Sequence, residues 1–305
     1  MGYIDASAEV ATSKGKDKKR PFDSILNFRD VGKTINDFLG EKRLAECRFY
    51  RSARPDDATA SDRDRLRREC NIKTVMDLRT ATEHIDQAKK RQLKLGDSAL
   101  SQSSGDVAES VKMPGINYLE VNVNGKGFER GLLWKLSYWN IAKLVTLMAL
   151  GYRIEAISIL GREVMLPRGL IGLGFDSIDL CGPEIAECLR AFTEEEKYGV
   201  LVHCTQGKDR TGLITALILF LLEIPLDAIT NDYMMSEQEL QPEMEARLIE
   251  IKSIGLTEDF ARCPKDWIAE MDRYLREKHG GVRAYLKAIG FSEEDQEKVI
   301  DRLKA

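Results

Sequence analysis

The stretch VLVHCTQGKDRTGLITALI, residues 200–218, changes character twice. An apolar run ends at His203 and Cys204, small and polar residues follow, and apolar residues then return at the spacing of a helix. A short run rich in valine and leucine is typical of a buried strand, and the later spacing is typical of a buried helix. The stretch therefore predicts a strand, a tight turn at Gly207 and a helix that begins near Thr211.

The turn between this strand and this helix is a predicted anion site. The first backbone N–H groups of a helix have no carbonyl partner within the helix, and the helix dipole adds positive potential at the same place. Loops of this kind bind phosphate groups. We expect the phosphate-binding residues to be Thr205, Gln206, Gly207, Lys208, Asp209 and Arg210.

Two side chains of the loop indicate a reaction. Cys204 is expected to lie within the positive potential, which favours the nucleophilic thiolate over the thiol. Arg210 can hold two phosphoryl oxygens and stabilise the negative charge that develops on them. Attack on phosphorus would give a cysteinyl phosphate that water resolves, and the Thr211 hydroxyl can assist the departing sulfur. This chemistry needs no metal or other cofactor, and we expect none.

The residues HCTQGKDRTG, 203–212, resemble the His-Cys-(five residues)-Arg-Ser/Thr-Gly loop of cysteine-dependent protein-tyrosine and dual-specificity phosphatases. Other segments resemble a fungal and bacterial branch of tyrosine phosphatases, which has mycobacterial members. They are LNFRDVG (26–32), FYRSARP (49–55), TVMDLRTATE (74–83), NDYMMS (231–236) and GGVRAYLKAIGFSEEDQEKVIDRL (280–303). The resemblance implies hydrolysis of phosphotyrosine, and also of phosphoserine or phosphothreonine, with Cys204 as nucleophile and Arg210 as phosphate clamp.

The proton donor for the leaving group is open between two aspartates. Asp209 lies within the loop, where the similar phosphatases also carry Lys-Asp before their arginine. Asp77 lies at the end of a predicted strand, and its structural alternative is an ion pair with Arg79. A general acid must come within about 3 Å of the leaving oxygen, which the sequence alone does not decide.

Other charged residues are expected to support the loop or to select the substrate. His203 is expected to order the loop by hydrogen bonding, and Arg29 and Asp30, together with Arg51, are expected to lie behind it. Lys208 indicates a second class of substrate. A further cation would suit the several phosphate groups of a phosphoinositide or a soluble inositol phosphate. The alternative for Lys208 is an ordinary ion pair with a nearby carboxylate.

The predicted fold class is α/β. Short runs rich in apolar residues at 48–52, 72–78, 117–123 and 200–204 are separated by helical stretches. This alternation favours a central, mostly parallel sheet with helices on both faces. The phosphatase resemblance implies the same arrangement. The helix after Thr211 is expected to end at Pro225.

The chain is expected to consist of a flexible polar tail, residues 1–21, and one phosphatase domain, residues 22–305. A Ser- and Gly-rich surface loop is predicted at 96–115. Residues 125–180 form an apolar helical insertion, predicted to be buried helices or a lid over the site. Surface contact with a bilayer is the alternative, whereas the charges within residues 132–161 argue against a transmembrane helix.

Composition excludes several classes of protein. With 46 basic and 50 acidic residues, the formal net charge is −4, which argues against nucleic acid as a partner. Six scattered cysteines and the absence of an apolar leader predict free thiols in the cytoplasm, with the nucleus as a further location. A silent phosphate-binding module and a sulfurtransferase are the competing classes, and the intact Cys204, Arg210 and Thr211 argue against both.

Overall fold

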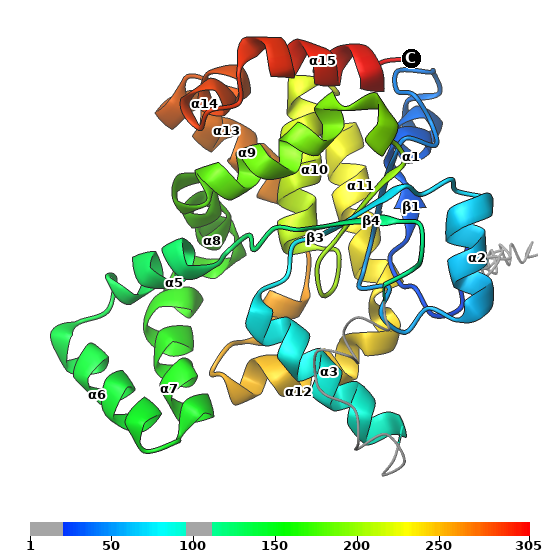
Figure 1. Ribbon diagram of the computed structural model, residues 1–305. Helices are drawn as coiled ribbons and strands as arrows, with labels where there is room; N and C mark the ends of the chain where they lie inside the picture. The colour runs from blue at the N-terminus through cyan, green and yellow to red at the C-terminus, as the bar shows by residue number, and fades with distance from the viewer. Residues whose placement is uncertain (1–20, 96–111) are drawn as a thin grey trace, which may run out of the picture.

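The computed structural model describes residues 21–95 and 112–305 (Figure 1). The strands are β1 (Arg29–Asp30), β2 (Phe49–Ser52), β3 (Thr74–Asp77), β4 (Asn117–Glu120) and β5 (Val200–His203). They form a five-stranded sheet in the order β1-β2-β5-β3-β4. Only β1 is antiparallel to its neighbour, and the other pairings are parallel. The prediction of an α/β fold with a mostly parallel sheet is therefore confirmed.

The helices surround this sheet and extend beyond it (Figure 1). Those before β5 are α1 (Val31–Leu39), α2 (Ala60–Arg68), α3 (Ala81–Leu95), α5 (Lys126–Leu133), α6 (Tyr138–Ala149), α7 (Arg153–Leu160), α8 (Leu166–Leu180) and α9 (Gly182–Arg190). Those after β5 are α10 (Asp209–Leu221), α11 (Leu226–Glu239), α12 (Met244–Ser253), α13 (Trp267–His279), α14 (Val282–Ala288) and α15 (Glu293–Leu303).

The alternation of side chains along each strand divides the core into two layers. Met76, Val200 and Val202 point to the face covered by the larger cluster, which includes the buried residues of α10. Val75 and Leu201 point to the opposite face, where the smaller cluster includes Leu66 of α2 and residues near the start of the described chain. Helices therefore cover both faces, as the sequence predicts.

The predicted strands form close to their expected positions, each a little shorter. The two-residue strand β1 was not predicted, because so short an antiparallel edge leaves no periodic signal. The helix after the loop was predicted to end at Pro225, but α10 ends at Leu221. Pro225 instead precedes the first residue of α11 as its N-cap. The expected tail lies outside the described residues except for Pro21, as does most of the expected loop at 96–115.

The apolar segment at residues 125–180 is not buried throughout. Within it, α6 has no buried residue, so the prediction of buried helices is wrong for α6. Helices α6 and α7 form a hairpin that projects from the rest of the molecule, at the lower left of Figure 1. Within residues 21–95 and 112–305, no helix is both long and apolar enough to cross a membrane.

Candidate active site

The loop from Cys204 to Lys208 connects β5 to α10 at the carboxyl edge of the sheet. Ser52 and Asp77 end the two strands beside β5, and both are in register with His203. Gly207 has a φ of 66°, and a Cβ at this position would lie 2.0 Å from the carbonyl oxygen of Ser52. Only glycine fits so close to the backbone of β2, and this contact turns the loop tightly into α10.

Cys204 lies at the bottom of the pocket that the loop forms. Its side chain is buried, yet the residue lines the pocket. The backbone N–H of Gly207 donates a hydrogen bond to Sγ at 3.2 Å. An N–H donor aimed at sulfur stabilises negative charge there, and the unpaired N–H groups of the first turn of α10 add to the positive potential.

Arg210, in the first turn of α10, holds a carboxylate from another helix. Its Nη1 and Nη2 donate to Glu83 Oε2 and Oε1 at 2.7 and 2.6 Å, and Nη1 also donates to the carbonyl of Leu78 at 3.2 Å. A guanidinium has five N–H groups, and these bonds use three of them. The Nε–H and one Nη2–H have no partner among the described residues, and together they form an edge suited to a phosphoryl group.

Glu83 was not predicted as a site residue. It is in the first turn of α3, where Thr80 and Glu83 exchange hydrogen bonds in the manner of a capping box. The Thr205 hydroxyl also donates to its Oε1. Burial alone would raise the pKa of Glu83, but Arg210 and Thr205 outweigh burial and lower it to about 2. Glu83 is therefore ionised at neutral pH and fixes the orientation of the Arg210 guanidinium.

The pocket around Cys204 is highly charged. Beyond the loop, its lining residues come mainly from α3 and α12 and from the segments that follow β2 and β3. They are Arg54, Arg79, Glu83, Asp86, Gln87, Lys90, Cys204, Thr205, Gln206, Asp209, Arg210, Arg247 and Glu250. None comes from residues 125–180, so the expected lid does not cover the pocket in this structure.

The two candidate proton donors differ in their exposure and in their hydrogen bonds. The Asp209 side chain is 42% exposed and lines the pocket, and its Oδ1 lies 3.5 Å from Lys208 Nζ. Asp77 does not line the pocket, and its side chain is only 6% exposed. Both Asp77 oxygens accept hydrogen bonds from Arg79, at 2.7–3.1 Å.

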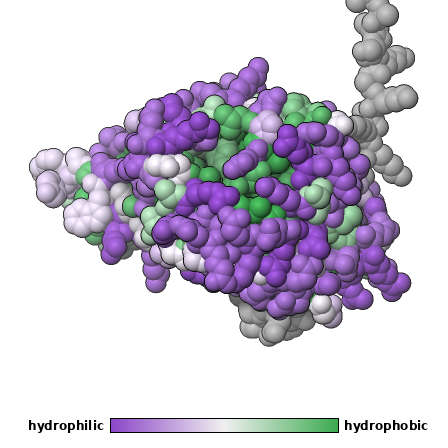
Figure 2. All heavy atoms as spheres, turned by 90° about the horizontal axis from the view of Figure 1, so that it is seen from above, coloured by the Kyte–Doolittle hydropathy of each residue, from purple (hydrophilic) through white to green (hydrophobic). Residues whose placement is uncertain are grey.

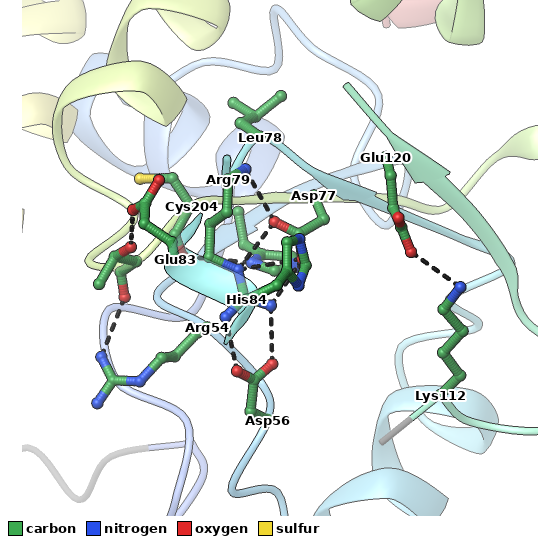
Figure 3. Close-up of polar contacts among 12 residues, drawn as sticks. Arg54, Asp56, Asp77, Leu78, Arg79, Glu83, His84, Lys112, Glu120 and Cys204 are labelled. Atoms are coloured by element: carbon green, nitrogen blue, oxygen red, sulfur yellow. Dashed lines mark hydrogen bonds and ion pairs between the residues drawn. The ribbon is translucent and has the colours of Figure 1, made fainter. Parts of the chain in front are cut away.

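Asp77 is the centre of a buried ionic network (Figure 3). Arg79 also binds both oxygens of Asp56, at 2.6 and 3.0 Å. Burial would raise the pKa of Asp77, but its electrostatic interaction with His203 and its ion pair and hydrogen bonds with Arg79 outweigh burial and hold it below its usual range. An aspartate that stays ionised is poorly suited to donate a proton at neutral pH. Of the two candidates, only Asp209 lines the pocket.

The Lys208 side chain points away from the pocket. It is fully buried, and its ammonium donates to the carbonyls of Phe260 and Arg262 at 3.1 and 2.7 Å. The expectation that this side chain supplies an extra charge for an inositol phosphate is not met in this structure. Lys208 instead ties the loop to the segment that follows α12.

A buried polar layer supports the loop from behind. Asn27 Nδ2 donates to the carbonyls of Gln206 and Gly207 at 3.0 and 3.1 Å. Arg51 Nη2 donates to the same Gly207 carbonyl at 2.7 Å. With their carbonyls held on this side, the loop's N–H groups are free to face the anion.

Asp232 in α11 holds the two supporting arginines. It accepts from Arg29 Nε at 2.6 Å and from Arg51 Nη1 at 2.5 Å. Arg29 therefore lies behind the loop, as expected, and supports it through hydrogen bonds to Asp232 and Asn27. Asp30 does not take part, because its carboxylate caps α1 and accepts from the N–H of Cys47. Asn27 and Asp232 were missed, although both lie within segments that resemble the phosphatases.

His203 and Thr211 are both buried beside the loop. His203 Nδ1 lies 3.2 Å from the Cys204 carbonyl and Nε2 lies 3.6 Å from Asp77. Burial lowers the pKa of His203, although Asp77 opposes this effect. The Thr211 hydroxyl has no hydrogen-bond partner among the described residues, and no bond to sulfur is formed in this state.

Sequence comparisons agree with this geometry. The model of the tyrosine phosphatase family matches residues 20–153 and 173–305. A tyrosine-protein phosphatase of Nostoc commune is 31% identical over 134 residues, which are 40% of this chain and 44% of that protein. The triple specificity protein phosphatase PtpB of Mycobacterium tuberculosis is 27% identical over 110 residues, 31% of this chain and 40% of that protein. The chain thus spans less than half the length of these two relatives.

Proposed function

Because the chain belongs to the tyrosine phosphatase family, we propose that it hydrolyses phosphotyrosine, and also phosphoserine or phosphothreonine, through a cysteinyl-phosphate intermediate. The observation that carries the proposal is the arrangement at the end of β5. There, Cys204 Sγ accepts an N–H hydrogen bond at the bottom of a pocket, and Arg210 is fixed beside it with one edge of its guanidinium free.

In the first step, the substrate phosphoryl group binds the N–H groups of the loop and the free Nε–Nη2 edge of Arg210. The Cys204 sulfur attacks phosphorus, the S–P bond forms and the P–O bond to tyrosine breaks. Asp209 gives its proton to the leaving phenolate oxygen. Arg210 stabilises the charge that accumulates on the phosphoryl oxygens in the transition state.

In the second step, water attacks the phosphorus of the cysteinyl phosphate. Asp209, now ionised, accepts a proton from that water, the S–P bond breaks, and the sulfur departs as thiolate. The buried Thr211 hydroxyl can turn to donate a hydrogen bond to this sulfur, because it has no other partner among the described residues. Glu83 acts only through Arg210 and Thr205, as a positioning residue.

Phosphoinositides and soluble inositol phosphates are the alternative substrates. Lys208 does not contribute to the pocket, so the choice depends on the cations that do line it. Arg54 and Arg247 are each paired with a glutamate, at 2.6 and 3.0 Å, and these pairs leave less charge for further phosphates. Lys90 also lines the pocket, but the pairing of both arginines favours phosphotyrosine. A reactive thiol also requires a reducing compartment, and we therefore place the protein in the cytoplasm.

Hydrolysis of para-nitrophenyl phosphate by the purified protein, without added metal and in the presence of a chelator, tests the activity. Phosphopeptides, phosphoinositide vesicles and soluble inositol phosphates are then compared by kcat/KM. We expect turnover of the aryl phosphate and the highest kcat/KM for phosphotyrosine peptides. Absence of turnover by reduced protein would contradict the activity, and a preference for inositol phosphates would contradict only the substrate assignment.

A further inference from the structure

Helix α6 presents an apolar surface that nothing in the described chain covers. The residues of this surface, named here the α6 face, are Tyr138, Trp139 and Val145 of α6, Leu150 at its C-cap, and Trp134 at the end of α5. Tyr138, Trp139 and Trp134 are 90%, 86% and 77% exposed. Single exposed apolar residues are common, but a contiguous group with three aromatic members is typical of an interaction surface.

The spacing within α6 shows that this surface is one side of a helix. Ile141, Leu144 and Leu147 are partly buried against the core and form the inner side. Tyr138 and Val145 are seven residues apart and therefore lie on one side, which faces outward. The helix is about 18 Å long, so its outer side could lie flat along a planar surface. At the left of Figure 2, where the hairpin lies, much of the surface is white or pale, whereas purple covers most of the rest around a green patch near the middle.

The charges of this segment have one sign. From Trp134 to Ile154 the chain contains Lys135, Lys143 and Arg153 and no aspartate or glutamate, although the whole protein has a net charge of −4. Lys135 pairs with Asp176 at 3.3 Å, whereas Lys143 and Arg153 are exposed. Aromatic residues flanked by lysine and arginine are typical of helices that lie at the interface of an anionic bilayer.

We propose that the α6 face docks the protein on an anionic lipid bilayer, with α6 parallel to the membrane plane. The tryptophan and tyrosine rings enter the headgroup region, and Lys143 and Arg153 contact acidic headgroups. Two features favour a bilayer over a protein partner. The hairpin projects outward from the rest of the molecule (Figure 1). The exposed Lys143 and Arg153 near its aromatic residues complement a negative surface.

Flotation of the full-length protein with two kinds of vesicle tests the proposal. One kind contains phosphatidylcholine alone, and the other also contains phosphatidylserine. We expect binding mainly to the second kind, and weaker binding at high salt. Intrinsic fluorescence should shift to the blue on binding, because two of the three tryptophans are on the α6 face and Trp267 is already buried.

Two variants locate the contact. Tyr138→Ser with Trp139→Ser should weaken binding by about ten- to a hundredfold, since two aromatic side chains no longer leave water. Lys143→Glu should reduce binding to the acidic vesicles by about tenfold or more. Phe38→Ser, which changes an exposed aromatic residue on α1, is the matched control and should bind as the unmodified protein does. No residue of the α6 face lines the pocket, so all variants should hydrolyse a soluble aryl phosphate normally.

The proposal would be overturned by absence of binding to the acidic vesicles, or by binding that both α6 variants leave unchanged. A concentration-dependent dimer that dissociates in the Tyr138/Trp139 variant, without vesicle binding, would also overturn it and would assign the α6 face to a second copy of the chain. Because the vesicle assay does not depend on turnover, its result is independent of the proposed hydrolysis.

Discussion

Replacing Asp232 with asparagine removes the negative charge on which the support of the phosphate loop depends. Its carboxylate lies 2.6 Å from Arg29 and 2.5 Å from Arg51, and its side chain is 1% exposed. Asparagine is nearly the same size, so the substitution leaves two buried guanidinium groups without their counter-charge. Removing one partner of a buried ion pair costs about 3–5 kcal/mol. A domain is stable by about 5–15 kcal/mol, so the loss should be a large part of the total.

Urea denaturation measures this cost. With a slope of about 3 kcal/mol per M, the midpoint should fall by about 1–1.7 M. Asp37→Asn is a matched control, because Asp37 pairs with Lys33 at 3.2 Å on the surface of α1, where both side chains are more than half exposed. An exposed pair contributes little, so the control midpoint should hardly change. Phosphate should also bind more weakly to the Asp232 variant, because Arg51 holds the Gly207 carbonyl.

The pH dependence of the difference in unfolding free energy between the unmodified protein and the Asp232→Asn variant gives a second check of this argument. Burial would raise the pKa of Asp232, but Arg29 and Arg51 outweigh burial and hold it below its usual range. A carboxyl group with a depressed folded-state pKa contributes stability above its unfolded-state pKa of about 3.9 and loses it as the pH falls through the folded-state value. The difference between the two proteins should be constant near neutral pH and shrink in acid. A difference below about 1 kcal/mol at neutral pH, or one that grows in acid, would refute the argument.

Further predictions concern the site itself. Asp209→Asn should slow phosphotyrosine hydrolysis by about 10²–10⁴-fold and spare an activated aryl phosphate, whereas Asp77→Asn should affect both alike; selective loss in the Asp77 variant would reverse the assignment. Glu83→Gln should lower kcat/KM by about 10- to 100-fold and weaken competitive inhibition by phosphate, because Arg210 loses a charged partner. Tighter inhibition would show instead that Glu83 obstructs the site. Gly207→Ala should abolish most activity and weaken phosphate binding in calorimetry, since its Cβ would lie 2.0 Å from a carbonyl oxygen of β2; normal binding would contradict that contact.

The fold was predictable where local pattern and burial agree. Val200 to Val202 are apolar, as fits β5 at the centre of the sheet with both faces covered, and the family resemblance led to the same fold. Helix α6 lies in the apolar segment that was predicted to form buried helices or a lid, with contact with a bilayer as the alternative. Its exposed outer side shows that composition alone does not distinguish a core helix from a helix on the surface.

The loop was also predictable in part, because its residues are consecutive in the chain. The structure brings Cys204, Gly207 and Arg210 together as expected, and their catalytic roles remain predictions. The contacts of Glu83 and Asp232 were not predictable, since Glu83 meets Arg210 across 127 residues of chain and Asp232 meets Arg29 across 203. The direction of the Lys208 side chain likewise depends on carbonyl groups more than 50 residues away.

The central claim is that Cys204 carries the phosphoryl group during turnover. Rapid acid quenching of the reaction with a phosphotyrosine peptide, followed by mass spectrometry of the digested protein, tests it directly. We predict phosphate on the peptide that contains Cys204, and neither this adduct nor turnover in Cys204→Ser, whose hydroxyl is far less ionised than a thiol. Full activity of the Cys204→Ser protein, or trapped phosphate on a different residue, would contradict the account.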